Sequence, residues 1–232
     1  MRVRVATTTV LGITAALLAV PACSTDTTGT KPDTAASAHT AKPADAAQQA
    51  APLTSAALET RLLDQSDLGS NYLRKPEHPT QHDDITVIGC PALSELGGDA
   101  ATGGTLTFPH KAKATFTYGG SSSELSEELY SDSATKLSDG IGRIFDAMTG
   151  CPTYQVVAGG TPIDMASQKL PTPHGLGDEQ WSQLLTFSTA GRSTVVKQTA
   201  IRDGSLLLIV SGSPALVDRH LDKALTKATA AS

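Results

Sequence analysis

The sequence contains few aromatic and few charged residues, and it shows no basic excess. Aromatic residues make up 4% and charged residues 18% of the 232 residues, and the formal net charge is −5 at pH 7. Proteins that bind nucleic acid usually carry a basic surface or a basic stripe, and this sequence has neither. We therefore expect no nucleic-acid partner.

The motifs that identify common catalytic and nucleotide-binding sites are also missing. There is no G-x-S-x-G nucleophile elbow, no phosphate-binding loop and no dinucleotide-binding fingerprint. The S-x-x-K pattern at residues 133–136 lacks the K-T-G motif that accompanies it in penicillin-binding proteins. Potential metal ligands gather in residues 77–84, where Pro79, together with Pro76 just before the segment, disfavours the helix that would bring His78 and His82 together. The sequence therefore predicts no metal, no cofactor and no catalysis.

The N-terminus has the pattern of a bacterial lipoprotein signal. A basic start is followed by an apolar stretch from Val5 to Val20, and then by Pro21-Ala22-Cys23. A charged start, a short apolar core and small residues before the cleavage site are typical of secretory signals. We predict a signal peptide over residues 1–22, lipidation of Cys23 and a location on the outer face of the cell membrane. The alternative is an ordinary secretory signal with an incidental cysteine.

The next segment differs in composition from the remainder of the chain. Residues 24–54 consist mainly of Ala, Thr, Asp, Lys, Pro and Gln, with no aromatic residue and with Leu53 as the single large aliphatic residue. Such a segment cannot bury enough apolar surface to offset the entropy of ordering the chain. We expect a lipidated Cys23 and a disordered tether over residues 23–54, and one folded domain over residues 55–232. A wall-binding or O-glycosylated stalk is the alternative for the tether.

Alternating apolar and polar residues predict several strands in the folded domain. The segments 112–118, 154–158 and 181–187 have the period of two that is typical of a strand. The continuous apolar run 206–210 is typical of a central strand that is covered on both faces. Asp203-Gly204 before this run predicts a hairpin turn.

Two helices are expected to pack on these strands. Ser121 with Glu124 forms a capping-box pattern, and apolar residues then recur on one helical face as far as Met148. Ser213 and Pro214 are typical of the start of a last helix. The fold class is therefore α+β, with an antiparallel sheet of about six strands and with a long central helix and a C-terminal helix packed on it.

Two cysteines lie beyond the lipoprotein signal, Cys90 and Cys151. Outside the cytoplasm, two thiols in one small domain most simply form one disulfide. This bond would close a loop of about 60 residues and would tie the strand before Cys90 to the end of the long helix.

Several short motifs occur in the order of a known family. They are Leu62-Leu63-Asp64, Gly89-Cys90-Pro91 after a strand, Gly150-Cys151-Pro152 after the long helix, and Gly175-Leu176-Gly177-Asp178-Glu179 before a strand. This order resembles the actinobacterial lipoproteins that are related to the extracellular sensor domain of the mycobacterial serine/threonine kinase PknH. The resemblance covers about residues 55–231. It implies an antiparallel sheet flanked by helices, with a cleft as the candidate site for a small ligand, and it supplies no catalytic residues.

The first functional hypothesis is a lipoprotein with a sensor-like or ligand-binding domain and no catalysis. Its partners would be the membrane, through the lipid anchor, and a small molecule or a cell-wall or lipid fragment. The candidate ligand site is a sheet face with four large aromatic residues, Phe116, Tyr118, Trp181 and Phe187.

Two alternatives remain open from the sequence. One is an envelope hydrolase or transferase that uses His174, Asp178 or Glu179. The other is a carrier for a hydrophobic metabolite. A sealed apolar cavity would favour the carrier, converging polar groups with a shifted carboxylate would favour the enzyme, and a shallow open cleft would favour the binder.

Overall fold

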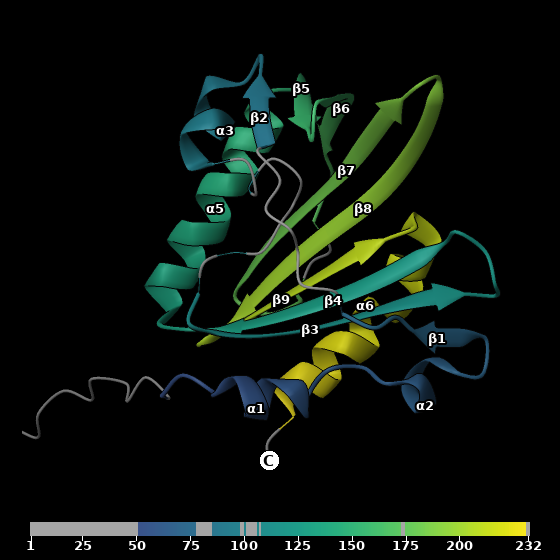
Figure 1. The fold of residues 1–232 in the computed structure, drawn as a ribbon. Helices are drawn as coiled ribbons and strands as arrows, with labels where there is room; N and C mark the ends of the chain where they lie inside the picture. Colours follow the sequence, from purple (N-terminus) through teal and green to yellow (C-terminus); the bar gives the residue numbers. More distant parts are fainter. Residues whose placement is uncertain are drawn as a thin grey trace, which may run out of the picture. The chain divides into compact units, whose positions relative to one another are not determined.

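One antiparallel sheet of nine strands dominates the computed structural model, which describes residues 51–77, 85–97, 100, 106, 108–172 and 175–230 (Figure 1). The strand order is β1-β3-β4-β9-β8-β7-β6-β5-β2, and every neighbouring pair is antiparallel. The strands are β1 (Tyr72–Arg74), β2 (Ile85–Ile88), β3 (His110–Tyr118), β4 (Glu124–Ser131), β5 (Thr153–Ala158), β6 (Thr161–Lys169), β7 (Glu179–Thr189), β8 (Arg192–Asp203) and β9 (Leu206–Gly212). The α+β class is confirmed, and the expected number of about six strands is corrected to nine.

Five helices accompany the sheet in the described part of the chain. They are α1 (Ser55–Glu59), α2 (Gln65–Leu68), α3 (Pro91–Leu96), α5 (Ala134–Gly150) and α6 (Pro214–Thr229). The long α5 and the C-terminal α6 pack on the sheet as expected. None of these helices is long and apolar enough to cross a membrane.

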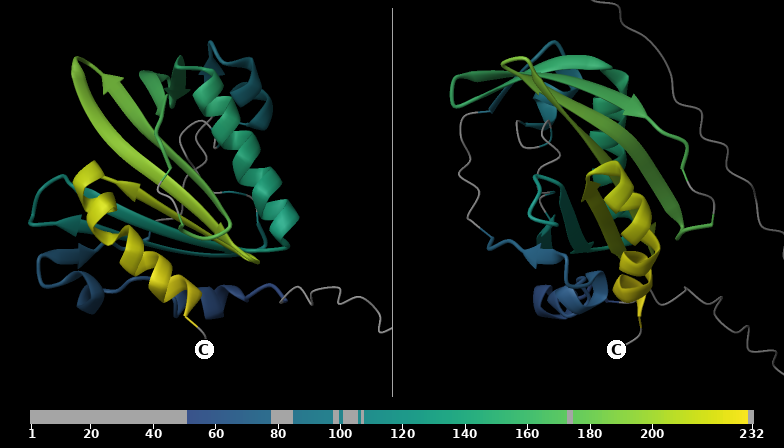
Figure 2. Two further views of the ribbon diagram at one scale, coloured as in Figure 1. Left: turned by 180° about the vertical axis from the view of Figure 1, so that it is seen from behind. Right: turned by 90° about the vertical axis from the view of Figure 1, so that its right-hand side faces the viewer.

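The central strand β9 divides the core into two layers. Leu206, Leu208 and Val210 belong to the cluster that α6 covers, and we call this side of the sheet the α6 face. Leu207 and Ile209 belong to a cluster with residues of α5, on the side that we call the α5 face. The left view of Figure 2 looks onto the α6 face. The prediction of a central strand covered on both faces is therefore confirmed.

The region of β4 was expected to be the start of the long helix, and this expectation is wrong. Ser121 caps a turn, because its hydroxyl donates to the carbonyl oxygen of Tyr118 at 2.6 Å and accepts from the N–H of Ser123. A strand follows, in which Leu125 and Leu129 face the core and are fully buried. Residues four apart share a face in a helix and in a strand alike, so their spacing did not separate the two structures. Helix α5 begins only at Ala134.

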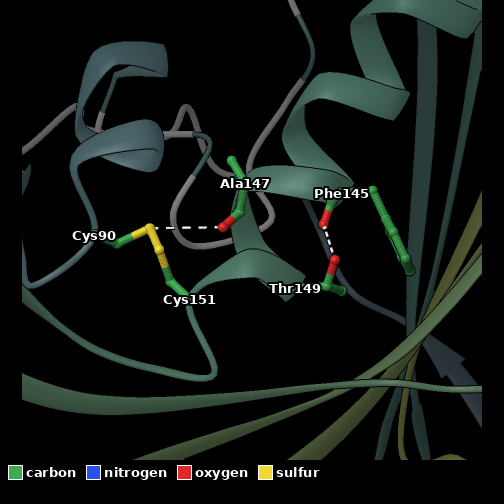
Figure 3. The surroundings of a disulfide bond; sticks show 5 residues. All are labelled: Cys90, Phe145, Ala147, Thr149 and Cys151. Carbon is green, nitrogen blue, oxygen red and sulfur yellow. Dashed lines mark hydrogen bonds between the residues drawn. A yellow bond between two sulfur atoms is a disulfide. The ribbon is translucent and has the colours of Figure 1, made fainter.

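The disulfide Cys90–Cys151 is present and is confirmed as predicted (Figure 3). Cys90 directly precedes α3, and Cys151 directly follows α5. The Cys90 sulfur lies 3.6 Å from the carbonyl oxygen of Ala147, in the last turn of α5. The bond therefore joins the β2–α3 connection to the C-terminal end of the long helix.

The predicted signal peptide 1–22, the lipid acceptor Cys23 and most of the tether 23–54 lie outside the described residues. Of the tether, residues 51–54 are described. Leu53 packs against the core, and its N–H donates to the hydroxyl of Ser131 at 2.9 Å, directly before α1.

Candidate functional site

The four aromatic residues of the expected ligand site lie on two different faces of the sheet. The strand pairing places Phe116 in line with Leu125 and with Gly212, on the α6 face, and Tyr118 shares that face. Trp181 pairs with Ala200 on the α5 face, and Phe187 lies on this face as well. The sequence expectation of one aromatic sheet face is therefore corrected.

These aromatic rings pack in different parts of the core. Phe116 is completely buried among the apolar residues beneath α6. Trp181 packs at the side of the cluster that contains Leu137 and Ile141 of α5, and Phe187 packs against the cluster that contains Cys90 and Met148. Tyr118 is half-buried and contacts the ring of Tyr72, with ring centroids 4.8 Å apart. The structure therefore does not bring the four rings together.

The carboxylates of the enzyme hypothesis, Asp178 and Glu179, are held by Arg202 of β8. The Nε of Arg202 donates to Glu179 at 2.7 Å, and its Nη1 donates to Asp178 at 2.8 Å. The N–H of Gly204 also donates to Asp178, at 2.9 Å, and the hydroxyl of Ser138 donates to Glu179, at 3.1 Å. Both carboxylates therefore join the start of β7 to the end of β8, and Glu179 also joins β7 to α5.

The same contacts keep both carboxylates ionised. The N–H of Gly204 and the Arg202 guanidinium hold the pKa of Asp178 below its usual range. The hydrogen bond from Arg202 lowers the pKa of Glu179 in the same way. A general acid needs a raised pKa, so these two residues lack the property that acid catalysis requires. His174 lies outside the described residues, as do His78, His82, Asp83 and Asp84 of the potential metal cluster.

No group of three or more potential metal ligands occurs among the residues that the structure describes. The described residues form a groove on the α6 face of β5, β6 and β7, with a volume of about 410 Å³. Helix α6 packs on β4, β8 and β9, and among the described residues no helix packs extensively on this face of β5, β6 and β7. The groove is shallow and open to solvent, because its floor is the sheet itself.

The register builds the floor of the groove from two rows of side chains. One row is Thr153, Ala166 and Thr186, and the other row is Gln155, Asp164 and Ser188. Tyr154 and Met165 also border the groove, but their side chains are buried with the opposite face. We call these six residues of the two rows the polar groove.

Hydroxyl, amide and carboxylate groups line the polar groove beside apolar surface. The Nε2 of Gln155 donates to Asp164 at 3.0 Å, and the hydroxyls of Ser188 and Ser193 lie 2.8 Å apart. Asp164 is the one charged residue among the groove-lining residues, and none of them is basic. The groove therefore offers hydrogen bonds to a polar ligand and disfavours an anion.

Sequence reasoning missed the polar groove. The one available signal was the polar half of the strand alternation, in which Gln155 and Thr186 alternate with buried Tyr154 and Leu185. The same alternation occurs on any solvated sheet face. It therefore could not identify a site without the register between the strands.

No protein-family model matches the chain, and no curated protein matches it. Among solved structures, the chain is similar to the extracellular domain of PknH from Mycobacterium tuberculosis, with a TM-score of 0.54 and 13% identity over 76% of this chain and 95% of that chain. An uncharacterized protein from Mycobacterium smegmatis, the Rv0999 ortholog, matches with a TM-score of 0.40 and 10% identity over 72% of this chain and 93% of that chain. The resemblance expected from the sequence is confirmed at the level of the fold: this chain has the fold of the PknH extracellular domain.

Proposed function

We propose that the protein is a membrane-anchored extracytoplasmic lipoprotein whose domain binds a small neutral, hydroxylated ligand in the polar groove and does not catalyse a reaction. The observation that carries this proposal is the open polar groove on the uncovered part of the α6 face. A volume of about 410 Å³ falls within the range of small-molecule sites. The groove is open rather than sealed, which favours a binder over a carrier of hydrophobic metabolites.

The side chains of the groove support the choice of ligand. The hydroxyls of Thr153 and Thr186 can both donate and accept hydrogen bonds, and the carboxylate of Asp164 accepts them. Sugar hydroxyls present the matching donors and acceptors. Because the groove lacks a cation, a phosphate or sulfate group would find no counter-charge there.

The location outside the cytoplasm is supported by the disulfide and by the lipoprotein signal. Disulfides persist in oxidising compartments and are rare in the cytosol. Two or more acyl chains on Cys23 would anchor the protein stably. Replacing Cys23→Ser should move the full-length protein from the membrane fraction to the soluble secreted fraction, and unchanged membrane retention would contradict the anchor.

The ligand hypothesis is tested by NMR titration of the folded domain with neutral di- and trisaccharides. The expected shifts centre on β5, β6 and β7. The double variant Asp164→Ala/Thr186→Val should weaken the affinity about tenfold or more, because it removes two groups that bond the ligand. A sulfated disaccharide serves as the anionic counterpart and should bind more weakly than its neutral parent.

The matched control is Thr194→Val, an exposed residue on the α5 face of β8, which should bind like the wild type. Shifts confined to another face of the sheet would overturn the assignment of the groove. Hydrolysis of the saccharides by the wild type would overturn the absence of catalysis.

A further inference from the structure

Glu127 occupies a core position in the middle of β4. Its side chain is completely buried on the α6 face, and its partners on the neighbouring strands are Ala114 of β3 and Val210 of β9, which are also completely buried. The side chains that complete its surroundings come from the N-terminal segment, residues 53–68, and from α6. A carboxyl group therefore lies inside the largest apolar cluster of the described domain.

The two oxygens of this carboxyl group have different partners. Oε2 accepts a hydrogen bond from the backbone N–H of Leu63 at 2.6 Å. Oε1 is shielded from solvent and has no hydrogen-bond partner among the described residues. An ionised carboxylate would leave this oxygen uncompensated, whereas a protonated carboxyl group carries no net charge into the core.

The charged groups around Glu127 are engaged elsewhere. Lys227 of α6 donates to Asp64 at 2.9 Å and to Asp67 at 2.5 Å, so two carboxylates of the N-terminal segment balance its charge. Arg61 donates from Nη1 to the carbonyl oxygen of Ala228 at 2.9 Å. The strands β3 and β9 contribute only apolar neighbours in the register. Burial dominates and raises the pKa of Glu127 to about 7, although the Leu63 N–H and Lys227 act in the opposite direction.

Of the elements that surround Glu127, the N-terminal segment is the one that can separate from the sheet most easily. The strands on both sides of Glu127 are hydrogen-bonded into the sheet, and α6 has 16 residues. Helices α1 and α2 have only 5 and 4 residues. A carboxylate that regains water will do so most easily where the N-terminal segment lifts, because this movement breaks no strand pairing.

We propose that Glu127 is a proton-controlled latch for the N-terminal segment, residues 53–68. Protonated Glu127 holds this segment on the sheet through Leu63, and ionised Glu127 loosens it. All residues before position 53 are connected to the domain through this segment. A rise in pH through neutrality would therefore loosen the attachment of those residues to the sheet. The latch is independent of the polar groove and of its ligand.

Hydrogen exchange of the domain at pH 6 and pH 8, corrected for the intrinsic exchange rates, tests the latch. In the wild type, the protection of the amides of residues 58–68 should fall about tenfold between these values, because the opening equilibrium rises about tenfold per pH unit up to the folded pKa of about 7 and levels off above it. Glu127→Gln keeps an acceptor for the Leu63 N–H without a titrating charge, so its protection should not change. Glu59→Gln replaces an exposed carboxylate of α1 and should behave like the wild type.

An equal fall in protection in the wild type and in Glu127→Gln would overturn the proposal. If Glu127→Gln fails to fold, infrared spectroscopy of the wild type decides instead, because a buried protonated carboxyl group has its own stretching band. Loss of this band between pH 6 and pH 8, together with loosening of residues 58–68, would support the latch. A spectrum without such a band at pH 6 would overturn it.

Discussion

Arg202 donates from Nε to Glu179 at 2.7 Å, and this contact joins two neighbouring strands beside the start of the β8–β9 turn. The Arg202 side chain is only 12% exposed, so its charge depends on the carboxylates that surround it. Replacing Arg202→Met should therefore destabilise the domain by about 1–3 kcal/mol in urea unfolding, because it leaves Glu179 and Asp178 without their cation. Ligand binding at the polar groove should persist.

The same contact predicts a dependence on acidic pH. Because the folded pKa of Glu179 is lowered, its contribution to stability is complete above its ordinary pKa and disappears as the pH falls through the folded value. The wild type should therefore lose stability below about pH 4.5, and Arg202→Met should lose less over the same range. Parallel curves for the two proteins would show that Arg202 does not hold the carboxylate in its ionised form.

The disulfide should contribute much of the stability of the α3–α5 region. It closes a loop with a sequence separation of 61 residues, for which chain entropy gives about 4 kcal/mol. The double variant Cys90→Ser/Cys151→Ser should lower the free energy of unfolding by about this amount, and its midpoint in urea should therefore be lower. Hydrogen exchange should increase first in α3 and in the last turn of α5, and an unchanged midpoint would contradict the expectation.

A glycine at the end of β9 allows two strands to approach each other closely. Gly212 has a φ of +144°, and a Cβ atom there would lie 2.1 Å from the carbonyl oxygen of Glu124. Gly212→Ala should therefore destabilise the domain by about 3 kcal/mol or more, since the backbone of β4 would have to move. Gly119→Ala is the matched control, because its φ is +60° and a Cβ atom there would contact nothing within 4 Å. It should cost about 1 kcal/mol in the same unfolding experiment.

The sequence predicted correctly those elements whose apolar residues follow a single pattern, so that only one kind of secondary structure fits them. The run 206–210 is apolar at every position, and it forms a strand with both faces buried. In β4, by contrast, Glu127 occupies an inward position between Leu125 and Leu129, so a polar residue interrupts the strand pattern. The four-residue spacing of Leu125 and Leu129 fits a helix as well as a strand, and the region was therefore predicted to be helical.

The candidate site depended on relationships that a single sequence does not contain. Whether Phe116 and Trp181 share a face depends on the register through four successive strand pairs, from β3 to β7. A shift by one residue in any of these pairs exchanges the faces. The disulfide needed no such register, because two cysteines in the domain allow one pairing.

Glu127 also predicts how global stability depends on pH. Its folded pKa of about 7 is above its ordinary value of 4.5, so the folded state binds more protons than the unfolded state between these values. Stability should therefore be greatest near the lower value and should fall as the pH rises, by up to about 3 kcal/mol at pH 7 and above. Glu127→Gln cannot ionise, so its unfolding free energy should lack this fall. Urea unfolding of both proteins between pH 4.5 and 8 measures the difference, which should widen up to about pH 7 and then stay constant. A constant difference across the range would show that the carboxyl group of Glu127 does not change its protonation there.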